Sequence, residues 1–235
     1  GAAVLFAKRP AEAEVINDIN MELTNFYWCA QVYYSDLKRE IDKTLHSRDI
    51  HAHAAHINQY PQFFSPVERA WAVWALCKMS FASMMGGAFG YDFGGVMPKK
   101  LRNAKDDVTE RLCQRLEHVT VENRNALDVI ACYDAPDAFH FVDPPYINSD
   151  CGHYDGVFSE QNMKELLCLL ETVKGKFMLT MFPYDMIEDY ARKNGWIIHR
   201  VERTISASKT SRRKQEEWMI CNYEDKKQAT LFDVK

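Results

Sequence analysis

The sequence predicts an α/β fold in which strands and helices alternate along the chain. Short apolar runs of strand length alternate with longer segments whose apolar residues recur at helical spacing. Hydrophobic residues make up 47% of the chain and charged residues 26%, which is typical of a globular domain. The longest apolar run, 70–77, stops at Lys78, well short of the ~20 residues that a membrane helix needs. We therefore expect no membrane partner.

The strands and helices are expected in a regular order. A strand at 14–17 precedes a long helix at 19–45. Ser65, Pro66 and Glu68 form a start signal for a helix at 67–85, and Ser159 begins another at 159–173. The other expected helices are 98–116, 126–132 and 184–194, and the other expected strands are 119–122, 138–142, 177–182, 196–201 and 218–223. One sheet is expected to hold both ends of the chain.

A mostly helical insertion, 45–103, interrupts this alternation. Five of the ten glycines lie between Gly86 and Gly95, interleaved with aromatic residues, which predicts a loop or hairpin. Long insertions at strand ends usually carry specificity elements. We therefore expect an α/β domain made of 1–44 and 104–223, an inserted domain at 45–103 and a tail at 224–235.

Charge and cysteine content exclude several classes of protein. The net charge of −4 and the isoelectric point near 6.1 give no basic signal for the chain as a whole, so a nucleic-acid surface must come from local clusters. The seven cysteines are spread out and form no Cys-x-x-Cys pair, which indicates reduced thiols. His51, His53 and His56 have no acid or Cys at ligand spacing, so no metal site is expected.

The strongest motif is Asp143-Pro144-Pro145-Tyr146, which follows the apolar strand 138–142. Ligands of open α/β sheets bind at the carboxyl ends of strands. The two prolines fix an extended corner beside a carboxylate and a flat ring, and backbone carbonyls there serve as acceptors. This set suits a planar ring that carries an amine. The alternative is a Pro-Pro turn with a surface tyrosine.

This motif resembles that of S-adenosylmethionine-dependent amino-methyltransferases, and the rest of the chain resembles the Dam-type (alpha-group) DNA adenine N6 methyltransferases. Residues 14–20 (Glu-Val-Ile-Asn-Asp-Ile-Asn) resemble that family's second block, and residues 121–127 resemble its adenine-contacting block. Residues 1–6 resemble the end of its Phe-x-Gly-Gly loop, and residues 217–223 resemble its terminal strand. The resemblance covers about residues 1–223, in the family's order.

The resemblance implies a fold, a cofactor and roles for individual residues. The fold would be a Rossmann-like methyltransferase sheet, with 1–44 and 104–223 catalytic and 45–103 recognising the target. The cofactor would be S-adenosylmethionine, held by Gly1, Asp18, Asn125, Ala126 and Asp143. Asp143, Pro144, Pro145 and Tyr146 would be catalytic. An Asp is common where Asn125 stands, and the family's first block is absent, so we expect residues to precede Gly1.

The implied reaction is methyl transfer to adenine N6 in double-stranded DNA. Hydrogen bonds from N6 to Asp143 and to the Pro144 carbonyl would localise the amine lone pair, and positioning would supply most of the rate. The base must first be flipped out, at a cost of a few kcal/mol that stacking on Tyr146 would offset in part. The alternatives are methylation of cytosine N4 or RNA adenine, and a non-catalytic DNA-binding subunit built on this fold.

Two basic clusters and one aromatic loop are the candidate DNA contacts. Lys99, Lys100 and Arg102 lie in a stretch without acids, and Arg212, Arg213 and Lys214 lie in another basic stretch. Such residues bind phosphates without choosing a sequence, although both clusters could instead be solvated faces. Phe89 and Tyr91 of the glycine-rich loop are candidates for base reading or for filling the gap left by a flipped base.

The tail carries a possible peptide motif. Gln228, Leu231 and Phe232 follow the Gln-x-x-Leu-Phe pattern of peptides that dock on bacterial sliding clamps. With no signal-peptide pattern, we expect a cytoplasmic, nucleoid-associated enzyme of a bacterium or a phage-infected cell, for example in a restriction-modification system.

Overall fold

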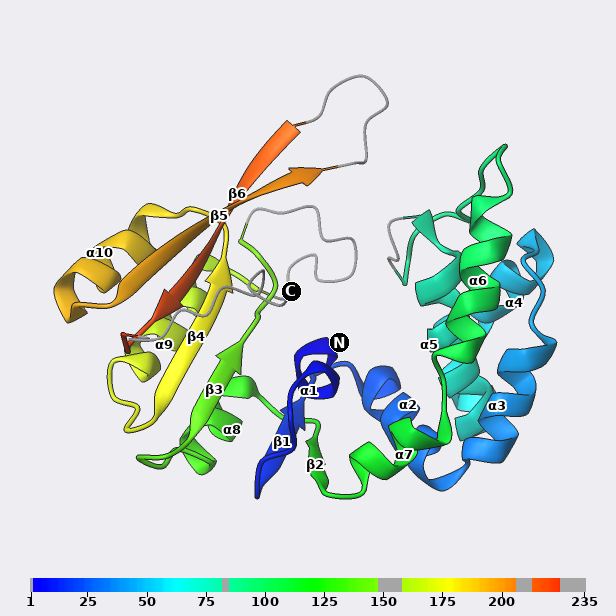
Figure 1. The fold of residues 1–235 in the computed structure, drawn as a ribbon, viewed down its shortest axis with the longest axis horizontal. Helices are drawn as coiled ribbons and strands as arrows, with labels where there is room; N and C mark the ends of the chain where they lie inside the picture. Colours follow the sequence, from blue (N-terminus) through cyan, green and yellow to red (C-terminus); the bar gives the residue numbers. More distant parts are fainter. Residues whose placement is uncertain (1, 82–84, 148–157, 206–212, 225–235) are drawn as a thin grey trace, which may run out of the picture. The chain divides into compact units, whose positions relative to one another are not determined.

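A two-stranded parallel sheet and a group of helices form the first of the two units into which the chain divides, residues 1–129. The computed structural model describes residues 2–81, 85–147, 158–205 and 213–224 (Figure 1). β1 (Glu14–Asn17) and β2 (Val119–Glu122) pair in parallel, with Glu14 opposite Val119 and Asn17 opposite Glu122. The sequence predicts the bounds of both strands correctly.

Helix α5 (Pro66–Met79) is the centre of the helical group in this unit. Ser65 and Glu68 form a capping box at its start, as the sequence signal predicts, and most of its apolar side chains are buried. Helices α2, α3, α4 and α6 contact it. The helices around it are α1 (Ala3–Ala7), α2 (Met21–Val32), α3 (Tyr34–Lys43), α4 (Arg48–Gln59), α6 (Val96–Asp106) and α7 (Glu110–Leu116), with a 3-10 turn at Pro61–Phe63.

Three expected helices are divided or shortened. The expected helix 19–45 breaks at Tyr33 (φ −120°, ψ 34°), and the expected helix 98–116 breaks before Thr109 (φ −117°, ψ 160°). The expected helix 67–85 ends at Met79, because Ser80 is extended and forms an antiparallel bridge with Phe89. The apolar pattern continues through these breaks because helices on both sides bury a face, so periodicity alone does not reveal them.

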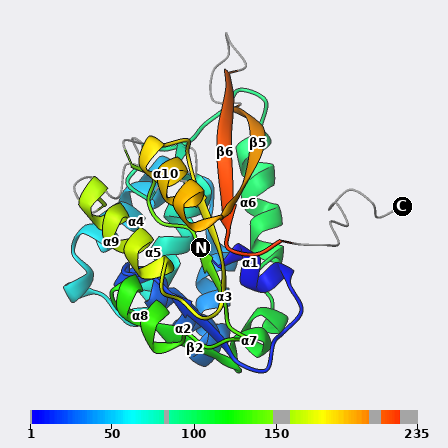
Figure 2. The ribbon, with the colours of Figure 1, turned by 90° about the vertical axis from the view of Figure 1, so that its left-hand side faces the viewer.

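The second unit, residues 130–235, holds a four-stranded sheet in the order β3-β4-β6-β5. β3 (Phe139–Val142) and β4 (Lys176–Met181) are parallel, whereas β6 (Arg213–Cys221) is antiparallel to both β4 and β5 (Ile197–Ile205). The helices α9 (Glu160–Leu170) and α10 (Asp185–Asn194) contact each other. Figure 2 shows the helices beside this sheet.

The core of the second unit follows from the alternation of side chains along β4. Phe177, Leu179 and Met181 are fully or almost fully buried, and they alternate as a strand with one buried face requires. Met163 and Leu167 of α9 are equally buried. Gly195, with φ of 67°, ends α10 in the left-handed conformation that glycine adopts without strain.

The last two strands are longer than expected at one end. The sequence predicts 196–201 and 218–223, but β5 and β6 pair from Ile197–Cys221 to Ile205–Arg213, well beyond the four residues of β6 that pair with β4. The outer arms of this hairpin consist mostly of charged and polar residues, so they carry no apolar signal. Two strands that pair mainly with each other need no buried face, which is why the sequence pattern misses them.

The prediction of one sheet is wrong for the described strands, because they pair in two sheets, one in each unit. The division falls within α8 (Ala126–Cys132), whose bounds the sequence predicts correctly. Hydrophobic periodicity identifies strands but does not choose their partners, which explains the error. Over the described residues, no helix is long and apolar enough to cross a membrane.

Candidate active site

The Asp-Pro-Pro-Tyr motif lies at the carboxyl end of β3, in the second unit. Val142, the last residue of β3, is opposite Leu179 of β4, so Asp143, just past β3, and Thr180 of β4 come next along the two parallel strands. The buried Thr180 hydroxyl donates a hydrogen bond of 2.6 Å to Oδ1 of Asp143. Asp143 itself is exposed. One carboxylate oxygen is therefore fixed by the protein, on a side chain that solvent or a ligand can reach.

The two prolines continue the chain without regular structure and are half-buried. A proline ring locks φ near −65° and removes the backbone N–H. Ile147, directly after the motif, is buried and anchors its far end. The motif is therefore a stiff segment fastened at both ends, by Thr180 at Asp143 and by the core at Ile147.

Phe182, directly after β4, and Glu217 of β6 both contact the Tyr146 side chain. Its hydroxyl donates a hydrogen bond to the carboxylate of Glu217, a buried residue of β6. Its ring meets the ring of Phe182 at 74°, with centroids 4.3 Å apart. Burial, the hydrogen bond to Glu217 and the nearby charge of Asp143 all raise the pKa of the Tyr146 phenol. The hydroxyl therefore stays protonated and remains a donor at neutral pH.

A second polar cluster lies at the carboxyl ends of β1 and β2, in the first unit. Asn17 and the backbone of Arg124 exchange two hydrogen bonds of 3.0 Å, and Asn123 donates one of 2.7 Å to the carbonyl of Asp18. The Asp18 carboxylate is half-buried and accepts a bond of 2.8 Å from the backbone of Asn20. These bonds fix the Asp18 carboxylate at the strand end.

The other residues that were predicted to hold the cofactor show fewer contacts that bear on cofactor binding. Asn125 uses its side-chain oxygen to accept a bond of 2.9 Å from the backbone N–H of Leu127, and so caps α8. Ala126 is the exposed first residue of that helix. Gly1 lies outside the described residues. Asp18, Asn125 and Ala126 belong to the first unit, whereas Asp143 belongs to the second.

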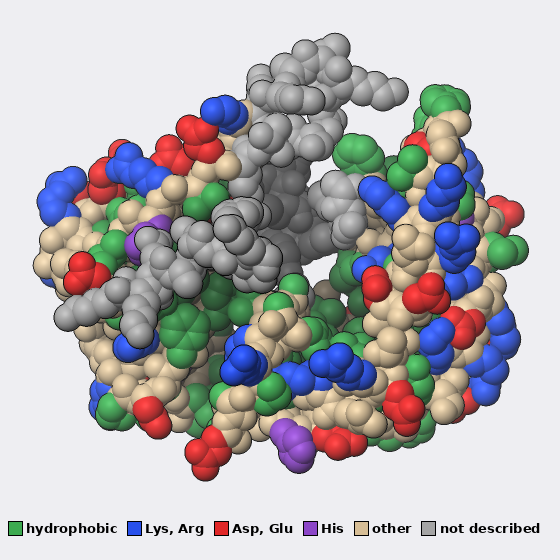
Figure 3. All heavy atoms as spheres, in the orientation of Figure 1, with side chains coloured by type: hydrophobic (Ala, Val, Ile, Leu, Met, Phe, Trp, Pro, Cys, Tyr) green, Lys and Arg blue, Asp and Glu red, His purple; other side chains and the backbone are tan. Residues whose placement is uncertain are grey.

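The basic cluster of α6 is exposed, which both a phosphate-binding surface and a solvated face require. Lys99, Lys100 and Arg102 are all exposed on this helix. Figure 3 shows many Lys and Arg side chains over the helices of the first unit. The second basic cluster is described only in part: Arg212 lies outside the described residues, as does the side chain of Arg213, and Lys214 pairs with Glu202 at 2.7 Å across the hairpin.

The glycine-rich loop places its two predicted aromatics differently. The Phe89 ring packs against the core and lies 4.7 Å from the His46 ring and 5.0 Å from the Arg48 guanidinium. Tyr91 is 62% exposed. Phe89 therefore anchors the base of the loop, whereas Tyr91 is available to a partner.

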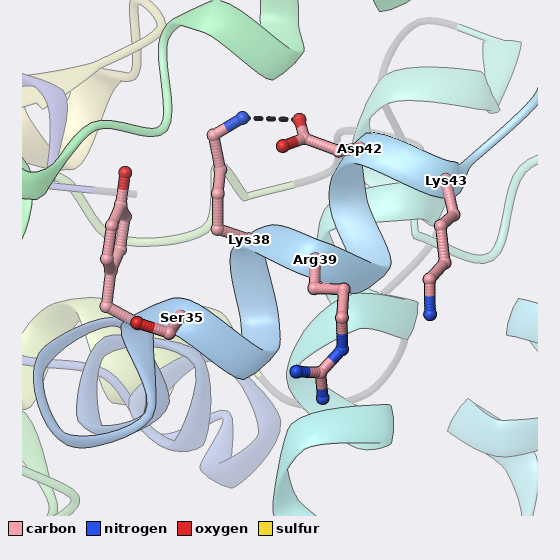
Figure 4. A pocket seen from close by; sticks show the side chains of 6 residues that line it. Ser35, Lys38, Arg39, Asp42 and Lys43 are labelled. Carbon is pink, nitrogen blue, oxygen red and sulfur yellow. Dashed lines mark hydrogen bonds and ion pairs between the residues drawn. The ribbon is translucent and has the colours of Figure 1, made fainter.

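A hollow of about 560 Å³ on the surface of α3 contains none of the motif residues. Lys38 pairs with Asp42, as the dashed line in Figure 4 shows, while Arg39 pairs with Asp36 and Lys43 with Glu40. Because each of these basic side chains is paired with an acid of the same helix, we interpret the hollow as a solvated surface. Its lining residues are Tyr34, Ser35, Lys38, Arg39, Asp42 and Lys43. Among the described residues, no group of three or more His, Cys, Asp and Glu side chains could hold a metal ion.

Sequence reasoning missed three residues around the motif: Thr180, Phe182 and Glu217. Thr180 is a polar residue near the end of an apolar strand, and Glu217 is a buried acid in the terminal strand block. Both residues stand out in the sequence, but the strand order β3-β4-β6 is needed to connect them with the motif. The predicted clamp peptide, with Gln228, Leu231 and Phe232, lies outside the described residues.

Together, these features define an α/β protein with a carboxylate and a fixed aromatic ring at the end of a parallel strand, the arrangement expected of an enzyme that grips a planar amine. The chain belongs to the D12 class N6 adenine-specific DNA methyltransferases, whose family description matches residues 1–206. No curated protein matches the chain. This family membership decides among the alternatives. The protein is an enzyme that methylates N6 of adenine in DNA. It is therefore neither a methyltransferase of cytosine N4 or RNA adenine nor a non-catalytic DNA-binding subunit.

Proposed function

We propose that this methyltransferase uses S-adenosylmethionine as its methyl donor and Asp143, Pro144, Pro145 and Tyr146 as its catalytic motif. The single observation that carries the assignment is the Asp143 carboxylate at the end of β3, exposed but with one oxygen fixed by Thr180. The parallel pair β3–β4 flanked by antiparallel β6 supports a Rossmann-like methyltransferase fold. We also propose 45–103 as the target-recognition part.

The chemistry of the first-unit cluster fits the proposed cofactor. A half-buried carboxylate at a strand end, Asp18, suits the two hydroxyls of a ribose, which need acceptors. The amide of Asn125 already accepts from Leu127 through its oxygen, so its NH2 group would face the cofactor adenine as a donor. When bound, S-adenosylmethionine supplies a methyl carbon that the N6 lone pair attacks as the carbon–sulfur bond breaks and its electron pair returns to sulfur.

One side chain and one backbone carbonyl of the motif would act on the target amine. Oδ2 of Asp143 and the Pro144 carbonyl would accept the two N6 hydrogens, which draws the nitrogen lone pair out of the ring and aims it. After transfer the nitrogen is cationic and loses one proton, so Asp143 need only be an acceptor and not a strong base. Tyr146 would stack on the flipped base, because its ring is held by Phe182 and Glu217.

The exposed α6 residues Lys99, Lys100 and Arg102 would contact DNA phosphates, with Arg212, Arg213 and Lys214 as a second contact. Tyr91 would lie near the bases. Double-stranded DNA is the proposed partner, and clamp binding through the tail stays a prediction.

The test is Asp143→Ala. Transfer of a labelled methyl group to DNA should be abolished, while calorimetric binding of S-adenosylmethionine stays within a few-fold of the wild type. Asp137→Ala, an exposed acid before β3, serves as the matched control and should keep full activity. The proposed role of Asp143 is wrong if the folded variant still methylates DNA, or if it loses cofactor binding altogether.

A further inference from the structure

One buried acid near the motif has no part in the proposed mechanism. Glu217 lies on β6, is only 8% exposed, and accepts a hydrogen bond from the Tyr146 hydroxyl. A carboxylate is costly to bury unless it is hydrogen-bonded, so its place inside the unit calls for an explanation. Its neighbour Glu216 is 39% exposed in its side chain and bonds to the indole N–H of Trp218. Adjacent residues of one strand point to opposite faces, and only Glu217 faces the motif.

The hydrogen bond restricts rotation of the aromatic residue of the motif. The two prolines hold the backbone, but the Tyr146 ring can still turn about its side-chain bonds. Phe182 meets the ring edge-on, and Glu217 holds the hydroxyl at its tip. The ring is therefore held both by Phe182 from the segment after β4 and by Glu217 from β6.

We propose that Glu217 is a positioning residue that fixes the Tyr146 ring in the plane on which the target adenine stacks. This inference rests on the proposed stacking role of Tyr146. A ring that is already oriented loses little freedom when the base arrives, so more of the stacking energy is available to hold the base against Asp143. The burial-raised pKa of the phenol keeps the donor in place throughout the neutral pH range.

The carboxylates of Asp143 and Glu217 would also affect the electrostatics around the target amine. The Asp143 carboxylate belongs to the motif, and the Glu217 carboxylate accepts a hydrogen bond from Tyr146 of the same motif. The N6 nitrogen becomes cationic during transfer. Negative charge near the target amine would stabilise that cation more than the neutral base, and so would favour the transition state.

The experiment compares the wild type with three variants by steady-state kinetics of methyl transfer to DNA. Tyr146→Phe removes the donor, Glu217→Met removes the acceptor at similar volume, and the double variant removes both. Each single variant should lower kcat by roughly ten-fold, with the cofactor KM unchanged, because it removes a hydrogen bond to a charged group. The double variant should be no worse than either single one, since the two changes remove one interaction.

Glu217→Gln and Glu216→Met are the two controls. Glutamine keeps an acceptor for the hydroxyl, so Glu217→Gln should recover most of the activity that Glu217→Met loses, with any remaining deficit due to the absent charge. Glu216→Met makes the matched change on the opposite face of β6 and should leave kcat near that of the wild type. Thermal unfolding and cofactor binding of every variant check that the second unit is still folded.

Three results would overturn the inference. Additive losses in the double variant, a Glu217→Gln variant as weak as Glu217→Met, or a raised cofactor KM would each make Glu217 a structural residue. Should Glu217→Met not fold, Tyr146→Phe and Glu217→Gln still decide the matter, because the inference requires the first to lose kcat and the second to keep most of it. Failure of the proposed function is distinguishable, since it would show as an Asp143→Ala enzyme that still transfers methyl groups.

Discussion

The hydroxyl of Thr180 donates a hydrogen bond of 2.6 Å to Oδ1 of Asp143, and so joins the end of β4 to the first residue of the Asp-Pro-Pro-Tyr motif. The bond occupies one carboxylate oxygen and restricts rotation of the side chain. Oδ2 is then oriented by the protein rather than by the incoming substrate. The parallel pairing of β3 with β4 creates this contact, since residues 143 and 180 come next along the two strands after the paired Val142 and Leu179.

Thr180→Val should lower kcat for methyl transfer by roughly ten-fold without changing cofactor affinity, because valine keeps the volume of threonine but cannot donate. Initial rates at saturating cofactor and DNA measure the effect. Thr180→Ser keeps the hydroxyl and should stay within a few-fold of the wild type. Equal losses in the two variants would mean that packing, and not the hydrogen bond, is what the site needs.

Asp18→Asn should weaken binding of S-adenosylmethionine by about ten- to a hundred-fold, the cost of losing a charge-assisted hydrogen bond. The amide oxygen of asparagine can still accept from the backbone of Asn20, so the strand end should keep its shape. Calorimetry with the cofactor measures the change, and Asp106→Asn on exposed α6 is the control. An unchanged affinity would remove Asp18 from the proposed cofactor site.

Neutralising Lys99, Lys100 and Arg102 together to glutamine should weaken binding to target and non-target DNA alike. It should also flatten the salt dependence of binding, by about 0.9 in logarithmic slope for each phosphate that is no longer neutralised. DNA titrations over a range of salt concentrations measure both effects. The same change at Lys38, Arg39 and Lys43 removes equal charge from a face where acids already pair with each residue, and it should alter the slope less. Equal slopes in the two triple variants would make α6 an ordinary solvated face.

Glu14 should make stability depend on pH in the acid range. Its buried carboxylate bonds to Arg115 at 2.8 Å, and that bond, aided by Lys8, lowers its pKa from the ordinary 4.5 to about 2 against the opposing effect of burial. A lowered native pKa means that the stabilisation is fully present above pH 4.5 and is lost as the pH falls toward 2. The amount is on the order of 3 kcal/mol at 1.36 kcal/mol per pKa unit.

Urea unfolding of Glu14→Gln between pH 3 and 6 measures this contribution. The variant should be less stable at pH 6, and its free energy of unfolding should fall less steeply with acid than that of the wild type. Glu12→Gln, which changes an exposed side chain two residues earlier, should keep the steep dependence. Parallel curves for the wild type and Glu14→Gln would contradict the assignment.

The local features of this protein can be predicted from short stretches of its sequence. The bounds of β1, β2 and α8, the capping box of Ser65 and Glu68, and the motif that starts at Asp143 all depend on neighbouring residues. Side-chain periodicity, helix caps and prolines act over a few neighbouring positions, so they can be recognised from the sequence alone. The family followed from the same local blocks.

The residues that surround the motif, and the pairing of the strands, depend on contacts between distant parts of the chain. Thr180 and Glu217 lie 37 and 71 positions from their partners Asp143 and Tyr146, and no local pattern links them. The division of the strands into two sheets, the length of the β5–β6 hairpin and the burial of Phe89 against His46 and Arg48 were likewise not predicted. Strand pairing is a non-local choice made by hydrogen bonds and shared burial, and the same short apolar segment is compatible with several neighbours until the whole sheet forms.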